Sequence, residues 1–179
     1  MGGYGSGRHN SYNSKTTVED CRVLNVNKLA RDGMIAPTAW QRSLVWRNTD
    51  TGEQVAAVDY TCVGSGEGLV FTLIYTVTHS DGEKHDVREP VQLQVTHPRL
   101  GGKRWWFTCP LVIRGRECNR RVGKLYLPPG GLYFGCRHCY DLTYTSCQES
   151  HKCDGLYRLL AAQTGSSPEF VKRILNEDR

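Results

Sequence analysis

Hydrophobic and polar residues alternate with a period of two from Trp40 to about residue 108, which is the pattern of half-buried β-strands. Turn-forming residues, mainly glycine, asparagine, aspartate and proline, interrupt this pattern at short intervals. Strands separated by such turns pair with their sequence neighbours as antiparallel hairpins. We therefore expect residues 38–108 to form a small antiparallel sheet or sandwich, with Cys62 in its core. The β-branched and aromatic runs that would form its strands are Ser43–Arg47, Val55–Cys62, Leu69–Val77, Val87–Val95 and Arg104–Thr108.

Helical patterns lie on either side of this β region. Val26–Met34 indicate a short helix that ends at Gly33, and Asp154–Gln163 indicate a longer helix with an N-capping aspartate. Gly165 ends the longer helix, and Pro168 stands in the first turn of another. The apolar stripes of the two C-terminal helices are Leu156, Leu159 and Leu160 on the first, and Phe170, Val171, Ile174 and Leu175 on the second. Together these patterns predict an α+β protein whose C-terminus is a helical hairpin.

The C-terminal run LLAAQTGSSPEFVKRIL is similar to a helix-turn-helix motif, which needs a small residue at the helix crossing and a glycine in the turn. The residues at the required spacings are Ala161, Gly165, Val171 and Ile174. Ser166 departs from the motif, because an apolar residue usually occupies that turn position. The similarity implies that Lys172 and Arg173 on the second helix reach phosphates and base edges. The alternative is an ordinary helical hairpin, which the neutral charge balance of residues 148–179 favours.

Size and composition limit the class of protein. The chain has 179 residues, of which 39% are hydrophobic and 9% aromatic, and this composition fits a folded protein. Its longest apolar run, Leu69–Tyr75, has the length of a strand and is too short to span a bilayer. The first residues lack the apolar core of a secretory signal. We therefore expect a cytoplasmic protein, in which eight cysteines serve metal binding rather than disulfides.

Four cysteines in one short segment carry the main chemical signal of the sequence. Cys136 and Cys139 form a C-x-x-C pair, and seventeen residues separate them from an earlier pair, Cys109 and Cys118. A pair, a hairpin-sized spacer and a second pair are the layout of a structural zinc ribbon, in which four thiolates hold Zn²⁺. The first pair is irregular because eight residues lie between its cysteines, although Gly115 allows the chain to reverse there.

Three further residues compete for a place in this metal site. Cys147, His151 and Cys153 follow closely in the sequence, and they could replace Cys109 or build a second site. The alternative is that they are ordinary side chains packed near a helix. Cys21 has no partner at metal-binding spacing, so it is expected to be a small buried hydrophobe.

Positive charge is concentrated around the four cysteines. Residues 101–147 contain eight Lys and Arg and two acidic residues, a balance of +6, whereas the whole chain carries +5. Strands at 120–127 and 132–136 are expected to flank a turn at 128–131, which gives this hairpin a basic face ending in an aromatic side chain. That face is either simply solvated or suited to a phosphate backbone, with Tyr126 available for stacking. The residues expected to bind nucleic acid are Arg104, Arg120, Arg121, Lys124, Tyr126, Arg137, Lys172 and Arg173.

Two adjacent tryptophans, Trp105 and Trp106, lie on the last strand that the β region predicts. Successive residues of a strand point to opposite faces of the sheet. We therefore expect one tryptophan in the core and the other at the surface, where it could serve as an anchor for a partner.

Several segments resemble a family of uncharacterised bacterial and phage proteins that contain a zinc ribbon. They are MGGYGSGR, KRWWFTCP, CNRRVGKLYLPPGG, YFGCRHCYDLTY and SCQES. The resemblance covers residues 1–8 and about 103–150. It implies a bacterial or phage source and a metal-bound ribbon, and it implies no established activity. Asn119 departs from the pattern, because ribbon knuckles commonly carry glycine after the cysteine.

These features favour a zinc-stabilised nucleic-acid-binding protein, a regulator or accessory factor with DNA in preference to RNA as its partner. The alternative is a protein-binding adaptor, such as a phage factor that binds and inhibits a host enzyme; no membrane contact is expected. An enzyme is not expected, because four thiolates close a metal site and the sequence contains no H-E-x-x-H or deaminase-like motif. The expected organisation is a flexible Gly/Ser-rich tail at 1–17, a mostly antiparallel β domain with a short N-terminal helix at 18–108, a zinc ribbon at 109–147 and a helix pair at 148–179.

Overall fold

The computed structural model describes residues 15–48, 51–65, 68–78, 82–149 and 154–177. They form two compact units. The larger unit runs from Val18 to Leu142, and the smaller one consists of residues 143–179 together with the N-terminal residues up to Thr17. The four cysteines of the predicted metal site therefore belong to the same compact unit as the β-sheet.

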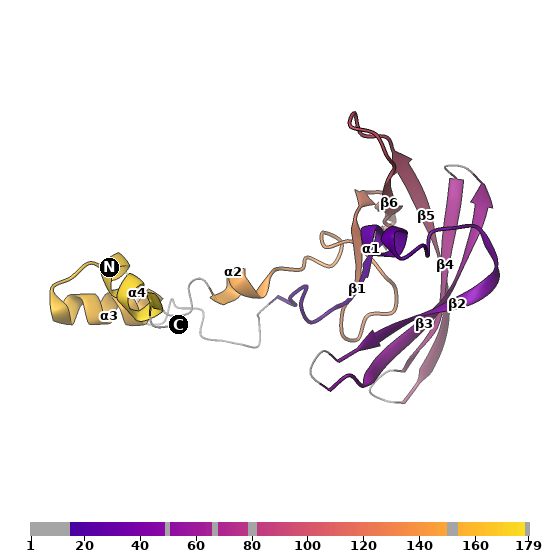
Figure 1. The fold of residues 1–179 in the computed structure, drawn as a ribbon. Helices are drawn as coiled ribbons and strands as arrows, with labels where there is room; N and C mark the ends of the chain where they lie inside the picture. Colours follow the sequence, from indigo (N-terminus) through magenta and orange to yellow (C-terminus); the bar gives the residue numbers. More distant parts are fainter. Residues whose placement is uncertain (1–14, 49–50, 66–67, 79–81, 150–153, 178–179) are drawn as a thin grey trace. The chain divides into compact units, whose positions relative to one another are not determined.

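Six antiparallel strands form one curled sheet in the larger unit (Figure 1). In order across the sheet they are β2 (Thr38–Arg47), β3 (Gln54–Ser65), β4 (Gly68–Thr78), β5 (Lys84–Thr96), β6 (Arg104–Thr108) and β9 (Arg121–Val122). Strands β2 to β5 each pair with the next strand along the chain, and β9 adds beside β6. The prediction of a small antiparallel sheet is confirmed.

Alternation along the strands gives this sheet a buried face and an outer face. On β4 every second side chain from Leu69 to Tyr75 is buried, while those between are exposed or half-buried. The same period on β5 places Glu89 on the buried face, where it is only 4% exposed. A carboxyl group in such a place needs hydrogen-bond partners. Tyr75 Oη and the Phe134 backbone N–H supply them, each 2.9 Å from Glu89 Oε2.

A second layer covers the buried face of the sheet. β1 (Arg22–Asn25) pairs antiparallel with β10 (Lys124–Leu127), and α1 (Val26–Arg31) continues directly from β1. Figure 1 shows α1 and β1 over one face of the sheet. The chain between the cysteine pairs adds Phe134, whose ring lies 6.3 Å from that of Trp46 and 5.7 Å from that of Tyr75. Among the largest fully buried side chains of this core are Tyr60, Phe71, Phe107, Leu93, Leu125 and Cys62.

Local signals fix α1 at both ends. At its start, Asn25 Oδ1 accepts hydrogen bonds from the backbone N–H groups of Asn27 and Lys28, at 3.1 and 3.4 Å. At its end, Gly33 has a φ of 65° and its N–H donates to Ala30 O at 3.2 Å. The left-handed backbone at this position favours glycine. The prediction that Gly33 ends the helix is therefore confirmed.

In its described residues, the smaller unit contains three short helices, α2 (Thr145–Glu149), α3 (Asp154–Thr164) and α4 (Pro168–Glu177). Gly165, with a φ of 67°, separates α3 from α4, and Ser167 Oγ caps α4 by accepting the Phe170 N–H at 3.2 Å. The two helices contact each other, and Ala161 is buried. Among the described residues, no helix is long and apolar enough to cross a membrane.

Lys15, Thr16 and Thr17 were expected to belong to the flexible tail, but they lie beside the start of the C-terminal segment. Thr17 forms a parallel bridge with Thr143, and the Thr143 N–H donates to Thr16 O at 3.1 Å. Gln148 Nε2 donates to Lys15 O. These contacts join positions far apart in the sequence, so a local Gly/Ser-rich composition cannot predict them. Residues 1–14 lie outside the described residues.

Candidate metal centre and basic surface

The sulfur atoms of Cys109, Cys118, Cys136 and Cys139 all lie within 4.8 Å of one another. The separations are 3.8 Å for Cys109 and Cys139, 3.9 Å for Cys118 and Cys136, and 3.5 Å for Cys136 and Cys139. A tetrahedron of thiolates at about 2.3 Å from a zinc ion has sulfur–sulfur edges of about 3.8 Å. The four cysteines are therefore close enough to hold one metal ion, and their geometry is compatible with zinc.

Cys136 and Cys139 are presented by a tight turn. The Cys139 N–H donates to Cys136 O at 3.1 Å, and the Tyr140 N–H donates to the same oxygen at 3.3 Å. The Leu142 N–H then donates to Arg137 O at 3.0 Å, which ties the chain after the pair back to the turn. This local hydrogen bonding places both sulfurs on the inner side of the turn, as the C-x-x-C spacing predicts.

The longer loop between Cys109 and Cys118 is itself a small hairpin. Its strands are β7 (Val112–Ile113) and β8 (Arg116–Glu117), and the residues between them, Arg114 and Gly115, have φ values of 52° and 74°. Two positive φ values in a two-residue connection are typical of a tight hairpin turn. The Cys118 N–H donates to Leu111 O at 2.9 Å, so the hairpin returns Cys118 to the vicinity of Cys109. The irregular eight-residue spacing is thereby accommodated, and Gly115 reverses the chain as expected.

Asn119, where ribbon knuckles commonly carry glycine, lies in the left-handed region with a φ of 48°. Asparagine adopts this conformation more readily than other residues with a side chain. Its Nδ2 also donates to Glu117 Oε2 at 2.8 Å. Asn119 therefore satisfies the backbone requirement of the turn after Cys118 without a glycine.

The four sulfurs differ in their affinity for protons. The pKa of Cys136 is lowered to about 4, mainly because the Cys109 thiol donates a hydrogen bond to its sulfur. The pKa of Cys109 is raised by the same hydrogen bond and by burial. Burial, followed by hydrogen bonds that its thiol donates to Cys118 and Cys136, raises the pKa of Cys139 to about 12. Of the three thiols with shifted pKa values, Cys136 is therefore the one that ionises most readily, and the thiolate is the form that binds a metal cation.

Only one of the three competing residues, Cys147, lies among the described residues. Cys147 lies in α2 and is exposed, and it is not one of the four cysteines whose sulfurs come together. His151 and Cys153 lie outside the described residues. Cys21 is buried beside Val18, Tyr126 and Leu142, as expected for a small hydrophobe.

Gly135 keeps the two halves of the centre close together, because it has no side chain. An added Cβ would lie 2.1 Å from Leu111 Cδ1 and 2.8 Å from Tyr140 Cε2. The Gly135 backbone cannot easily retreat, since it exchanges two hydrogen bonds with Tyr126. We expect Gly135→Ala to destabilise the protein by about 1–3 kcal/mol through overpacking. Denaturant unfolding of this variant measures the loss, and Gly123→Ala, whose Cβ would meet nothing closer than 4.0 Å, is the control. Equal stability of the two variants would contradict the proposed role of Gly135.

Tyr126 is buried, although strand alternation predicted that its ring would be exposed and available for stacking. It is only 6% exposed and packs in the small core with Val18, Cys21 and Leu142, so its ring is not available for stacking. The expected long strand at 120–127 is interrupted at Gly123: β9 pairs with β6, whereas β10 pairs with β1. Elements on both sides of β10 then bury three successive residues, Leu125, Tyr126 and Leu127. Simple alternation therefore fails here.

The basic side chains predicted for nucleic acid remain accessible in most cases. Arg104, Arg120, Arg121 and Lys124 are exposed, and Arg137 is half-buried. Within the part of the chain that the structure describes, no carboxylate forms an ion pair with any of the first four. Lys172 and Arg173 are exposed on α4, where the Arg173 guanidinium lies 5.5 Å from the centre of the Phe170 ring.

The two tryptophans of β6 point to opposite faces of the sheet, as expected. Trp105 packs against the core, and Trp106 lies on the other side of the strand. The Arg104 guanidinium lies 4.2 Å from the centre of a Trp106 ring, and that of Arg121 lies 5.6 Å away. We call Arg104, Trp106 and Arg121 the Arg–Trp cluster. The sequence alone paired neither arginine with a tryptophan, because Arg121 reaches Trp106 only through the β6–β9 pairing.

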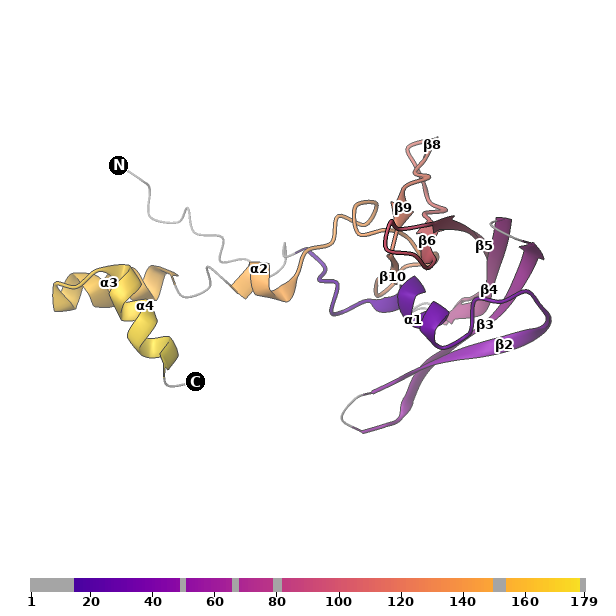
Figure 2. The same cartoon turned by 45° about the horizontal axis from the view of Figure 1, so that its top comes forward.

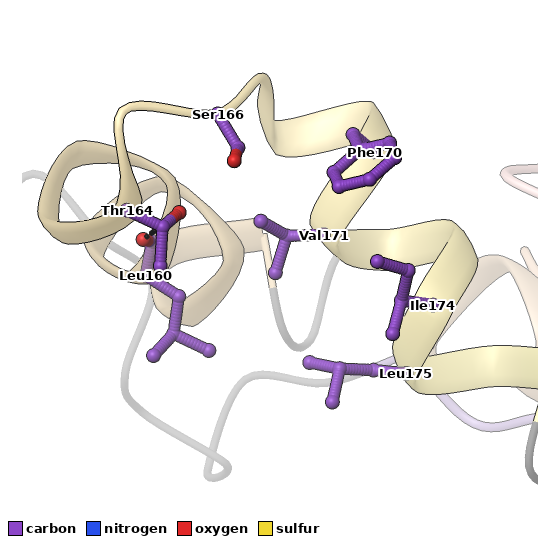
Figure 3. A pocket seen from close by; sticks show the side chains of 7 residues that line it. All are labelled: Leu160, Thr164, Ser166, Phe170, Val171, Ile174 and Leu175. Atoms are coloured by element: carbon purple, nitrogen blue, oxygen red, sulfur yellow. Dashed lines mark hydrogen bonds between the residues drawn. The ribbon is translucent and has the colours of Figure 1, made fainter.

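A second accessible feature is an apolar groove between α3 and α4. Figure 3 shows Leu160 of α3 on one side, with Val171, Ile174 and Leu175 of α4 on the other. The groove has a volume of about 230 Å³, and Ile174 and Leu175 are each nearly half exposed. Phe170 also lines the groove, and Leu156 and Leu159 add further exposed apolar surface to α3. Exposed apolar patches of this kind mark interaction sites.

Comparisons with protein-family models, with curated proteins and with solved structures give no match to this chain.

Proposed function

We propose that the four cysteines hold one Zn²⁺ in a structural zinc ribbon. Four thiolate ligands fill the tetrahedral coordination of zinc, so no position is open for water or a substrate. The ion would supply cross-linking of the two cysteine turns. It would thereby hold the hairpin of β7 and β8 and the chain between the pairs against the sheet. This role is one of scaffold rather than reaction centre, and we propose no enzymatic activity.

We further propose that the protein binds nucleic acid, as a regulator or accessory factor with a preference for DNA over RNA. The observation that carries this proposal is the Arg–Trp cluster, in which two exposed arginines place their guanidinium groups near one aromatic ring. Arginine binds phosphate through a planar fork of donors, and aromatic rings stack on bases. The surrounding segment adds charge of the same sign, since residues 101–147 sum to +6.

Binding of this kind is expected to weaken steeply with salt, because each neutralised phosphate releases a counterion. Two to four phosphate contacts predict a fall in affinity of about 10- to 100-fold between about 50 and about 200 mM salt. Fluorescence anisotropy with labelled DNA and RNA measures this dependence. Arg121→Ala is expected to reduce the salt slope by about one. Arg31→Ala, on α1 over the buried face of the sheet, should leave the slope unchanged. If the purified protein binds neither DNA nor RNA at low salt, nucleic-acid binding is refuted.

The groove between α3 and α4 supports a second candidate function, a protein-binding adaptor. Its apolar lining suits a partner helix or loop better than a phosphate backbone. The same two helices carry Lys172 and Arg173, the residues that a helix-turn-helix would use on DNA. An adaptor would bind its protein partner through the groove with no need for nucleic acid, so Ile174→Ser would abolish its binding while Arg121→Ala would not.

A further inference from the structure

The Arg–Trp cluster belongs to a larger polar surface on the outer face of the sheet. Directly opposed residues of antiparallel strands point to the same face. Gln94 opposes Trp106, Thr96 opposes Arg104 and Thr108 opposes Arg121. The neighbouring pair of Leu93 and Phe107 is fully buried and points to the core. The six residues of the first three pairs therefore share the outer face, over β5, β6 and β9, which Figure 2 shows next to one another.

Hydrogen bonds fix the side chains of this surface in place. The Trp106 indole Nε1–H donates to Thr96 Oγ1 at 3.0 Å, and Gln94 Nε2 donates to Thr108 Oγ1 at 2.8 Å. The indole ring is therefore held by its own donor at the edge and by the Arg104 guanidinium at 4.2 Å. An aromatic ring that is already ordered loses little conformational entropy when a ligand stacks on it.

The charge on this surface has one sign. Arg104 and Arg121 are its ionisable side chains, and among the described residues neither has a carboxylate partner. Its other members are glutamine and threonine, which donate and accept hydrogen bonds without adding charge. Exposed arginines without a carboxylate partner match a phosphodiester backbone, and the ordered aromatic ring beside them matches an unstacked base. A duplex offers no base face to such a surface, because its bases are stacked on one another.

We infer that the outer face of β5, β6 and β9 binds single-stranded nucleic acid. A base stacks on the layer formed by Trp106 and the Arg104 guanidinium, and Arg121 contacts an adjacent phosphate. Gln94 lies beside the ring and is placed to hydrogen-bond a base edge. This inference rests on the proposed nucleic-acid binding and adds two details to it. The partner is single-stranded, and Trp106 is the residue on which its base stacks.

The test compares four labelled ligands of about 12 nucleotides, which is within the range that one such surface covers. They are oligo-dT, oligo-rU, a mixed-sequence DNA single strand and the duplex of that strand. Anisotropy titrations at low salt are expected to give affinity for the single strands at least tenfold above that for the duplex. The dT and rU arms distinguish DNA from RNA as the source of the single strand.

Trp106→Ala is expected to weaken single-strand binding about tenfold or more, because stacking on an aromatic side chain contributes that much per base. Trp106→Phe should retain most of the affinity, since phenylalanine also stacks. Val63→Ala, an exposed position elsewhere on the outer face, is the matched control. Metal content and circular dichroism of each variant establish that it is folded, and Trp106→Leu, which keeps an apolar side chain but cannot stack, takes the place of Trp106→Ala if that variant does not fold.

Two different failures remain distinguishable. If wild type binds none of the four ligands, nucleic-acid binding itself is refuted. If the duplex binds as tightly as the single strands, or if Trp106→Ala binds them as wild type does, the protein binds nucleic acid but this surface does not read single strands. Loss of affinity in Trp106→Phe equal to that in Trp106→Ala would also overturn stacking as the cause.

Discussion

Cys136→Ser is expected to lose its metal and to unfold the larger unit under conditions where wild type is stable. Serine is a poor ligand for zinc, and three remaining thiolates hold the ion far more weakly than four. Metal binding by a structural zinc site is folding free energy, on the order of 10–16 kcal/mol in small zinc domains. Here the effect reaches the core, because Phe134 lies two residues before Cys136 and is fully buried against Trp46 and Tyr75.

Elemental analysis and thermal unfolding measure both consequences. Wild type is expected to contain one zinc per chain, Cys136→Ser close to none, and a chelator should reproduce the loss of stability in wild type. Cys147→Ser is the matched control, because Cys147 is exposed and is not part of the cluster. Stoichiometric zinc in Cys136→Ser, or its loss in Cys147→Ser, would show that the ligand set differs from these four cysteines.

Most of the sheet was predictable because its signals are local. Each strand from β2 to β6 has a period of two, and each turn between them is short and rich in glycine or other turn-forming residues. Neighbouring strands therefore had one obvious pairing. The four cysteines were predictable for a similar reason, since ligand spacing is a property of the sequence. The eight-residue interval at Cys109 became intelligible only when Arg114 and Gly115 were seen to close a hairpin.

The features that the sequence could not reveal depend on long-range pairing. β1 pairs with β10, about a hundred residues further along the chain, and this pairing buries Tyr126 where alternation left it exposed. Arg121 likewise lies near Trp106 only because β9 pairs with β6. The burial of Glu89, in contrast, could have been predicted from the sequence. Glu89 stands midway between Val87 and Val91, and the alternation of the strand places all three side chains on the face toward the core.

Glu89 is expected to make the protein less stable as pH rises through about 7. Its burial raises the pKa of the carboxyl group to about 7, against the usual 4.5, although hydrogen bonds from Phe134 and Tyr75 oppose the rise. The folded state therefore holds the proton more tightly than the unfolded chain does. The resulting stabilisation is fully present below pH 4.5 and is lost as pH rises through 7. The difference between the two pKa values corresponds to a change in the free energy of unfolding on the order of 3 kcal/mol.

The hydrogen bonds explain why the protonated form suits this site. Tyr75 Oη lies 2.9 Å from both Glu89 Oε2 and Leu132 O, yet a tyrosine has only one proton to donate. When Glu89 is protonated, it can donate to Tyr75, and Tyr75 can donate to Leu132. When Glu89 is ionised, Tyr75 can satisfy only one of the two acceptors. Burial raises the pKa of Tyr75, and burial together with the Glu89 charge raises that of Tyr140 to about 12, so neither titrates in the same range.

A comparison of wild type with Glu89→Gln isolates the contribution of Glu89 to the pH dependence of stability from that of every other titrating group. The glutamine carbonyl oxygen can take the place of Glu89 Oε2, which both partners contact, and accept hydrogen bonds from the Phe134 N–H and from Tyr75 Oη without a proton to lose. We expect the variant to match wild type near pH 5 and to exceed it in free energy of unfolding by on the order of 3 kcal/mol near pH 8. Urea unfolding of both proteins across this range gives the difference, in which protonation of the cysteine ligands cancels because the two proteins share it. A difference between the two proteins that does not change with pH would contradict a raised pKa at Glu89, and a variant that is less stable at pH 8 would show that the ionised carboxylate is the form the fold prefers.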